Sequence, residues 1–287
     1  MAGFLEVVEQ GEAEERRFAL PAAHVEVLAD PESATFVAPF GPLLAGIGGA
    51  LPEVIEAYRT GAGVPYARYG PDFRTGQGAI NRPVFMSELP GWIAGLPGVG
   101  ARLSAGEPLR IADVGCGQGF STISIARAFP GARVAGFDLD PASVADAREG
   151  AAAAGVDVEF VQIDAGGIAG EGSFDLVCVL EALHDMAHPV EALAAARAAL
   201  APGGGVLVVD ERVAERFEAP GDPVERIMYG WSVTHCLPAS REEEGSEALG
   251  TVLRIDVVQD LARRAGFGGA EVLPVENDFF RLYWLAG

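Results

Sequence analysis

The sequence predicts an α/β fold in which a doubly wound, mostly parallel sheet of seven strands carries helices on both faces, beside a small mixed region at the N-terminus. Three observations lead to this prediction. From about residue 105, apolar runs alternate regularly with helical stretches, a glycine-rich turn follows the first run, and two neighbouring apolar runs close the chain. Such alternation is typical of a parallel sheet covered on both faces. The arrangement is therefore Rossmann-like, with an antiparallel final strand pair.

Length and composition limit the possible classes of protein. At 287 residues, 49% of them hydrophobic, the chain can bury a large core. The net charge of −21 repels polyphosphate, so no nucleic-acid partner is predicted. No apolar run approaches the roughly 20 residues that span a bilayer, and no signal sequence is recognisable. The three cysteines lie far apart without a C-x-x-C pair, which supports neither a disulfide framework nor a zinc site. We therefore expect a cytoplasmic protein without a membrane partner or a metal ion.

The first two regions precede the sheet. Residues 1–38 contain two alternating runs, "FLEVV" and "RRFAL", which predict a hairpin followed by a short helical stretch. Residues 39–104 predict a helical linker and a lid, with helices over about 40–60 and in "NRPVFMSELPGWIAGL" and a loop, "GAGVPYARYGPDF", between them. Polar residues gather in and just after this loop, and we expect them to form a pocket wall in which an arginine pairs with a ligand carboxylate: Tyr66, Tyr69, Arg74, Gln77 and Asn81.

Residues 105–287 predict the sheet itself. The helix after the second strand has Asp140 as its N-cap and Pro141 at its first position. The breaker "APGGG" separates a later helix from the fifth strand, and an insertion at about 211–255 precedes the last helix. The expected strands are "LRIADVG", "RVAGFDL", "VEFVQID", "FDLVCVL", "VLVVDE", "AEVLPV" and "FRLYWLA".

The turn "DVGCGQGFS" after the first strand is a candidate ligand-binding loop. Gly115, Gly117 and Gly119 allow the backbone to approach a ligand closely and to aim the first amides of a helix at it. Asp138 follows roughly 20 residues later at the end of the second strand, where a carboxylate accepts both hydroxyl groups of a ribose. The pattern predicts a ligand that contains adenosine.

Asp113-x-Gly115-x-Gly117-x-Gly119 closely resembles motif I of the class I S-adenosylmethionine-dependent methyltransferases. The resemblance continues through "GFDLD", "QIDA", "FDLVCVLEALHDM" and "LAPGGGVLVVDE". It implies S-adenosylmethionine as cofactor and S-adenosylhomocysteine as product, with residues 39–104 as the lid over cofactor and substrate. The cofactor-binding residues that it implies, together with those expected from the lid, are Asp113, Gly115, Gly117, Gly119, Asp138, Leu139, Asp164, Ala165, Leu180, Tyr66 and Tyr69.

Ionisable residues crowd the segment "LEALHDMAHP" after the fourth strand, at the sheet edge where ligands bind. "LHDM" resembles the "LHDW" of small-molecule O-methyltransferases, whose histidine removes the proton of the acceptor hydroxyl. His184 takes that position, although Met186 replaces the tryptophan and a further acidic residue is missing. A histidine with an ordinary pKa of about 6.5 can act as a base at neutral pH. A purely structural role for His184 has equal standing.

His235 is a rival base, and it lies in the insertion segment "MYGWSVTHCL". Met228, Tyr229 and Trp231 share its face of a short helix, which predicts either an aromatic lid over the acceptor or packing against the sheet. Glu181 and Glu211 end strands, where they can orient a histidine, bind the acceptor or face solvent. His188, just before Pro189, is expected at an exposed helix start.

The whole chain also resembles bacterial methyltransferases in which a winged-helix dimerisation domain precedes the catalytic one. Residues 1–38 match the wing, while the helix-turn-helix part is missing, which fits a naturally short chain and a cut one equally. We expect a methyltransferase that acts on a small aromatic or polyketide-like acceptor. The expected reaction is O-methylation with His184 as base, and a homodimer is possible. The alternatives are N- or C-methylation, a non-catalytic regulator that binds S-adenosylmethionine, and a nicotinamide-dependent oxidoreductase.

Overall fold

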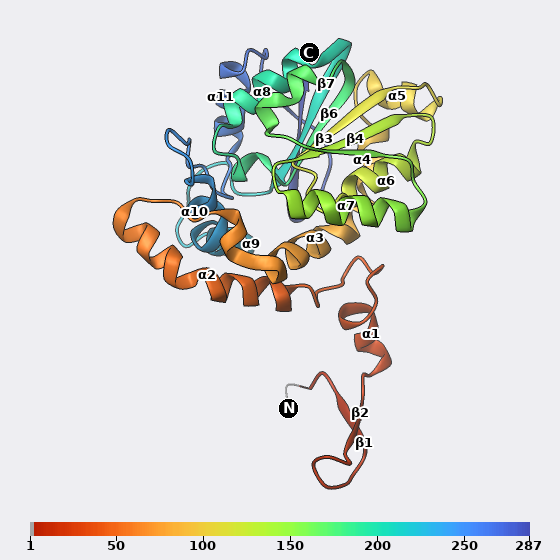
Figure 1. The fold of residues 1–287 in the computed structure, drawn as a ribbon, viewed down its shortest axis with the longest axis vertical. Coiled ribbons are helices and arrows are strands. Elements are labelled where there is room, and N and C mark those ends of the chain that lie inside the picture. The colour runs from red at the N-terminus through yellow and green to blue at the C-terminus, as the bar shows by residue number, and fades with distance from the viewer. Residues whose placement is uncertain (1–2) are drawn as a thin grey trace.

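The computed structural model describes residues 3–287. At the N-terminus, strands β1 (Glu6–Glu9) and β2 (Arg17–Ala19) form an antiparallel hairpin that leads into helix α1 (Ala22–Leu28). This segment extends away from the rest of the molecule (Figure 1). The hairpin and the short helix are present where the alternating runs predicted them. The likeness of residues 1–38 to a wing stays a prediction.

The helical region that follows contains α2 (Phe40–Thr60), α3 (Gly70–Ser87), α4 (Leu89–Ala94) and α5 (Val99–Ser104). The structure differs from the prediction between α2 and α3, where a loop was expected. A 3-10 turn, η1 (Tyr66–Tyr69), leads directly into α3 at Gly70. Proline is well tolerated in the first turn of a helix, so Pro71 marks a helix start here rather than a loop. The polar residues expected on that loop therefore project mainly from a helix.

The main sheet confirms the predicted architecture. Its strand order is β5-β4-β3-β6-β7-β9-β8. The first five strands are parallel, and β9 runs antiparallel between β7 and β8. The predicted breaker lies within β7, where the register with β6 shifts after Leu200. The strands are β3 (Arg110–Val114), β4 (Arg133–Asp138), β5 (Glu159–Gln162), β6 (Phe174–Leu180), β7 (Leu200–Glu211), β8 (Glu271–Val272) and β9 (Phe280–Ala286).

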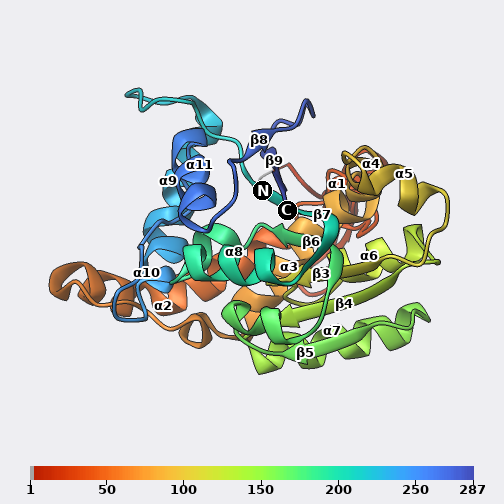
Figure 2. The same cartoon turned by 90° about the horizontal axis from the view of Figure 1, so that it is seen from above.

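Helices cover both faces of this sheet (Figure 2). Helices α8 (Pro189–Ala198) and α11 (Ile255–Arg264) share one buried apolar cluster with the strands. Helices α4, α5 and α6 (Phe120–Ala128) share a second cluster on the other face. Helix α7 (Pro141–Ala154) begins as predicted, because the Asp140 carboxylate accepts a hydrogen bond from the Ser143 amide at 2.8 Å.

The insertion after β7 forms α9 (Pro223–Trp231), a π-helical turn η4 (Ser232–Cys236) and α10 (Leu237–Ser240). These helices lie against α2 (Figure 1). Trp231 stacks on Phe40 with 5.8 Å between ring centroids, which fixes the insertion to the helical region. Within residues 3–287, no helix is both long and apolar enough to cross a membrane.

Candidate active site

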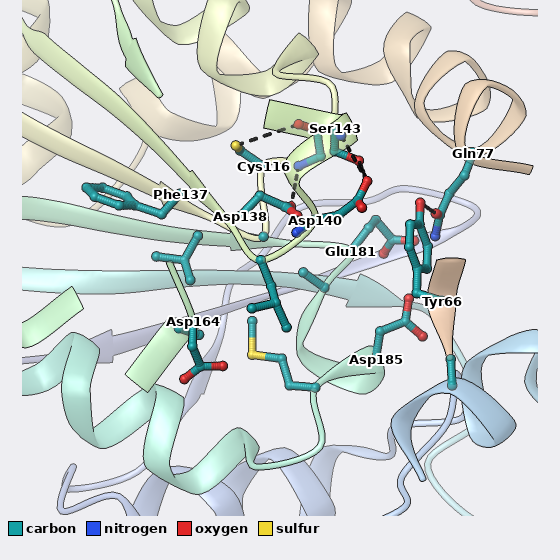
Figure 3. A pocket seen from close by; sticks show the side chains of 18 of the residues that line it. Tyr66, Gln77, Cys116, Phe137, Asp138, Asp140, Ser143, Asp164, Glu181 and Asp185 are labelled. Carbon is teal, nitrogen blue, oxygen red and sulfur yellow. Dashed lines mark hydrogen bonds between the residues drawn. The ribbon is translucent and has the colours of Figure 1, made fainter. Parts of the chain in front are cut away.

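A cavity of about 450 Å³ opens at the carboxyl ends of β3, β4 and β6. The glycine loop, the strand ends, α3 and the insertion all contribute to its wall (Figure 3). Cavities of a few hundred Å³ at this edge of a doubly wound sheet are typical small-molecule sites. The fold therefore brings together the motifs that the sequence placed far apart.

The glycine loop forms the floor of this cavity. Gly115 adopts a positive φ of 74°, and a Cβ atom there would lie 2.6 Å from the Cβ of Ala182. Gly119 has a φ of 77°, and its Cβ would lie 2.7 Å from the ring of Phe160. Only glycine tolerates both conditions without strain. Gly115 and Gly117 border the cavity, whereas Gly119 lies behind it and serves the close packing of the loop on β5.

Asp113 lies beneath the loop rather than in the cavity wall, which differs from the ligand contact that the resemblance implied. It is 1% exposed, and its Oδ2 atom accepts hydrogen bonds from the hydroxyl groups of Ser121 at 2.6 Å and Thr122 at 2.7 Å. Burial raises the pKa of this carboxyl group to about 6. Asp113 thus fastens the end of β3 to the start of α6.

Asp138 borders the cavity at the end of β4, as predicted. Its Oδ2 atom accepts the Gly117 amide hydrogen at 2.7 Å, and its Oδ1 atom accepts that of Asp140 at 2.9 Å. Burial raises its pKa above the ordinary value. Across the cavity, Asp164 accepts the Gly166 amide hydrogen at 2.8 Å (Figure 3). Leu139, Ala165 and Leu180 also line this part of the wall.

The lid contributes one of its two tyrosines to the cavity. The Tyr66 hydroxyl donates to Gln77 Oε1 at 2.9 Å, and both side chains border the cavity. Tyr69 instead points away, donates to the Thr234 carbonyl oxygen at 3.1 Å and packs on Phe73, so it does not line the cavity and its contact with the ligand stays a prediction. Arg74 borders the cavity, with its Nε atom 3.2 Å from Asp146 Oδ2, so this guanidinium already has an anionic partner.

His184 lies behind the wall and is 3% exposed. Its Nδ1 atom lies 3.0 Å from Asp210 Oδ1 and 3.2 Å from Glu211 Oε2. Its Nε2 atom lies 3.5 Å from Oδ1 of Asp185, which does border the cavity. Burial disfavours the imidazolium ion, yet these three carboxylates together hold the pKa of His184 well above its ordinary value. The expectation of a histidine that presents a free basic nitrogen to the cavity is not met at His184.

Glu181 and Glu211 flank this histidine. Glu181 ends β6 with a φ of 55°, a strained conformation for a residue other than glycine and one that is frequent at functional sites. Its carboxylate borders the cavity and, with that of Asp185, reaches toward Tyr66 (Figure 3). Burial, reinforced by Asp210, raises the pKa of Glu181 to about 8. Glu211 lies behind the wall and is 7% exposed. The prediction that Glu211 faces solvent, one of the three alternatives for this residue, is therefore wrong.

His235 borders the cavity from the π-helical turn. It is 2% exposed, and the rings of Phe73 and Tyr69 lie 4.1 and 4.6 Å from its own, centroid to centroid. Burial lowers its pKa to about 4, so the imidazole is neutral near pH 7. Its Nε2 atom has no hydrogen-bond partner within residues 3–287. His235, unlike His184, therefore borders the cavity, and its Nε2 atom is buried and has no partner within the described residues.

The aromatic lid predicted from the insertion is not found at Tyr229 or Trp231. Neither side chain borders the cavity. Trp231 stacks on Phe40, and the Tyr229 hydroxyl accepts a hydrogen bond from Arg254 at 3.2 Å. Trp231 thus packs on α2 rather than on the sheet, and Tyr229 is 40% exposed, so neither residue packs the insertion against the sheet as the alternative expected. His188 borders the cavity, with its Nε2 atom 3.3 Å from Glu243.

Two residues of this region escaped the sequence reasoning. Asp210 is fully buried beside His184, and Cys236 adjoins both histidines. Asp210 stands one position before Glu211 at the end of a parallel strand, a signal that could have identified it. Cys236 gave no comparable signal, since only the tertiary fold brings the insertion to the end of β6.

Comparison with known proteins supports these motifs. Residues 111–204 match a family model described as a methyltransferase domain. Over 99 residues, the chain is 39% identical to the ubiquinone biosynthesis O-methyltransferase of Nitrosococcus oceani, a match that covers 34% of this chain and 41% of that protein. Over 104 residues, it is 35% identical to the demethylmenaquinone methyltransferase of Thermus thermophilus, covering 36% and 47% respectively. The chain thus spans less than half the length of these curated relatives.

Solved structures agree over a longer stretch. A putative O-methyltransferase from Nostoc punctiforme superposes with a TM-score of 0.70 at 18% identity, covering 99% of this chain and 81% of that one. Human N-acetylserotonin methyltransferase, solved with S-adenosylmethionine, superposes with a TM-score of 0.67 at 17% identity, covering 99% and 79%. At this identity the likeness concerns the fold. Together with the sheet order and the glycine loop, it defines a class I methyltransferase fold. Residues 111–204 of the chain are a methyltransferase domain.

Proposed function

We propose that this protein transfers a methyl group from S-adenosylmethionine to an oxygen atom of a small, aromatic or polyketide-like molecule. The observation that carries the proposal is the cavity, which has Asp138, Asp164 and the glycine loop at one end and Glu181, Asp185 and His235 at the other. The family match of residues 111–204 supports the reaction class. A structural neighbour, PigF, was solved with S-adenosylhomocysteine.

The residues fit the cofactor. Asp138 has carboxylate lone pairs beyond those that accept the two backbone amides, and they can accept ribose hydroxyl groups. We assign Asp164 and Ala165, which line the same cavity, to the adenine. When bound, S-adenosylmethionine supplies an electrophilic methyl group on a sulfonium. The chain contributes mainly by holding the acceptor oxygen in line with that methyl group and by excluding water.

An acceptor hydroxyl must also lose its proton. His235 is neutral, borders the cavity and has an unoccupied Nε2 atom, so we assign it the role of proton acceptor. His184, predicted as the base from "LHDM", has a pKa that its carboxylate neighbours raise despite its burial, and it lies behind the wall. N- or C-methylation would not require this histidine in the same way, and substitution of His235 separates the alternatives.

Cofactor binding is tested first by calorimetry with S-adenosylmethionine and S-adenosylhomocysteine. The wild type should bind both, and Asp138→Ala should weaken binding by about 2 kcal/mol or more, the scale of hydrogen bonds to a charged group. Asp157→Ala, which removes an exposed carboxylate on the loop before β5, is the matched control and should bind like the wild type. Absence of binding to the wild type would contradict the proposed function.

Proton removal is tested by methyl transfer to a panel of phenols. His235→Ala should lower the turnover number by about 10²- to 10⁴-fold, the usual contribution of a general base, while S-adenosylhomocysteine still binds. His24→Ala, on α1 and outside the cavity, serves as the control and should keep the wild-type rate. Full turnover by His235→Ala would refute the assignment, and loss of turnover only in His184→Ala would restore His184 as the base.

The compartment and the assembly are part of the same proposal. We place the protein in the cytoplasm, since Cys116, Cys178 and Cys236 are all free thiols, as in a reducing compartment. We also propose a homodimer, for which exposed apolar side chains on α2 supply a surface.

A further inference from the structure

One carboxyl group at the acceptor end of the cavity has no role in the proposed methyl transfer. Glu181 follows directly on the last residue of β6, and its side chain borders the cavity (Figure 3). Its Oε1 atom is buried and has no hydrogen-bond partner within residues 3–287. A buried polar atom without a partner is costly, and this one adjoins a space that a ligand can fill. Glu181 is therefore placed to meet the acceptor.

The backbone at Glu181 fixes where this side chain points. Its amide still donates to the Val209 carbonyl oxygen of β7 at 2.8 Å, so the residue pairs like the end of a strand. Its φ of 55° then lies in the left-handed region, which favours glycine and strains other residues. Strained conformations of this kind are concentrated at functional sites. The chain thus accepts strain at the position from which the glutamate reaches the cavity.

The carboxyl groups around His184 outnumber the positive charge that one imidazole can carry. Asp185, Asp210 and Glu211 each have an oxygen atom within 3.5 Å of a ring nitrogen of His184. Glu181 belongs to the same cluster, yet no ion pair within residues 3–287 includes it. Neighbouring carboxylates disfavour each other's ionisation, and even a protonated His184 offsets a single negative charge. Some of these groups must keep their protons, and Glu181 has no ionic partner that would support its charge.

Burial acts on Glu181 in the same direction as this crowding. Together with the charge of Asp210, it raises the pKa of Glu181 to about 8, and the pKa of the facing Glu211 also lies well above its ordinary value. Glu181 is thus a neutral carboxylic acid near pH 7. Unlike a carboxylate, a carboxylic acid has an O–H group that donates a hydrogen bond.

The polar groups beside Glu181 leave room for such a donor. The carboxylate of Asp185 offers oxygen atoms that accept hydrogen bonds, and the Tyr66 hydroxyl already donates to Gln77 at 2.9 Å. His235, in its proposed role, takes a proton from the acceptor. An oxygen atom of the acceptor that is not methylated and carries no hydrogen therefore finds its donor at Glu181.

We propose that Glu181 is a specificity-determining residue, a neutral acid that donates a hydrogen bond to a carbonyl oxygen of the methyl acceptor. This inference rests on the proposed function and narrows the acceptor to a hydroxyaryl ketone or a hydroxyquinone. The hydroxyl group of such a molecule gives its proton to His235 and receives the methyl group. Its carbonyl group binds Glu181, which keeps its proton throughout.

Infrared spectroscopy of the full chain near pH 7 tests the protonation of Glu181. The carbonyl stretch of a protonated carboxyl group lies apart from the bands of carboxylates. The wild type should show such a band, Glu181→Gln should lose it, and Glu159→Gln, which changes an exposed carboxylate of β5, should keep it. Absence of a band that depends on Glu181 would overturn the proposal. This readout needs neither cofactor nor acceptor, so its failure is distinguishable from failure of the methyltransferase proposal.

Calorimetry on the complex with S-adenosylhomocysteine tests the contact with the acceptor. The probes are hydroxyacetophenones and the ethylphenols of the same substitution pattern, in which a CH₂ group replaces the carbonyl. The wild type should bind the better ketone about tenfold more tightly than its ethylphenol, the scale of one hydrogen bond. Glu181→Leu should lose this preference, whereas Glu181→Gln, whose amide also donates, should retain most of it. Glu159→Gln should behave like the wild type.

Rescue by glutamine but not by leucine separates a hydrogen-bond donor from a residue that only supports the fold. If Glu181→Leu does not fold, the wild type still decides, because the infrared band of Glu181 should move to lower wavenumber when the ketone binds. Equal affinity for ketones and ethylphenols, binding of neither series, a preference that persists in Glu181→Leu, or a band that the ketone leaves in place would each contradict the proposal.

Discussion

Asp113 holds the glycine loop in place at a cost in the stability of the folded protein. The fold buries its carboxyl group completely and gives it two hydroxyl partners, Ser121 and Thr122, which connect the end of β3 to the first turn of α6. Two neutral donors offset only part of the cost of burying a charge. Because its pKa rises from 3.8 to about 6 on folding, the free energy of unfolding depends on pH.

The pH dependence follows from the direction of that shift. A carboxyl group with a raised folded-state pKa stabilises the fold fully below its unfolded pKa, and this contribution is lost as the pH rises through about 6. Between pH 5 and pH 7.5, the free energy of unfolding of the wild type should fall relative to Asp113→Asn by about 1.4 kcal/mol, one pKa unit. Urea unfolding at both pH values measures the difference. Asp157→Asn should show no such change, and parallel behaviour of Asp113→Asn and the wild type would contradict the argument.

Helix α2 shows two apolar faces. One faces the molecule with Leu43, Ile47 and Val54 in a buried cluster shared with α3. The other leaves four large side chains exposed at positions that share one side of the helix: Leu44, Leu51, Ile55 and Tyr58. A contiguous apolar stripe of this kind is typical of a surface that binds a partner. In the homodimer that we propose, a second copy of this chain covers this stripe.

Polar substitutions in this stripe should lower the molar mass of the protein in solution from that of a dimer to that of a monomer, and they should leave the fold intact. Burying a leucine or isoleucine stabilises a contact by roughly 1.5–3 kcal/mol, so the double variant Leu51→Glu, Ile55→Glu should weaken a homodimer by far more than tenfold. Light scattering over a dilution series measures it. Arg59→Gln, an exposed polar position of the same helix, should leave the dimer intact. A wild type that is monomeric at all concentrations would refute the assignment.

At the scale of the whole molecule, the layers of the fold and the cofactor end of the cavity could be predicted from the sequence. The alternation of strands and helices is a local pattern, and Gly115 and Asp138 stand at strand ends that share an edge of a parallel sheet. The acceptor end was less predictable. The raised pKa of His184 depends on Asp210, and the place of His235 at the cavity wall depends on a π-helical turn. Both are set by contacts between distant segments, which local patterns do not encode.

The position of β9 between β7 and β8 has a consequence for how the molecule is made. All five parallel strands are synthesised before β9, yet β9 covers the long edge of β7 with a strand whose Leu282, Tyr283 and Leu285 are almost fully buried. Until those residues leave the ribosome, the nascent sheet exposes an unpaired, valine-rich edge, which is an aggregation hazard. The cavity can thus begin to form early in synthesis, whereas protection of the sheet has to wait for the final strand.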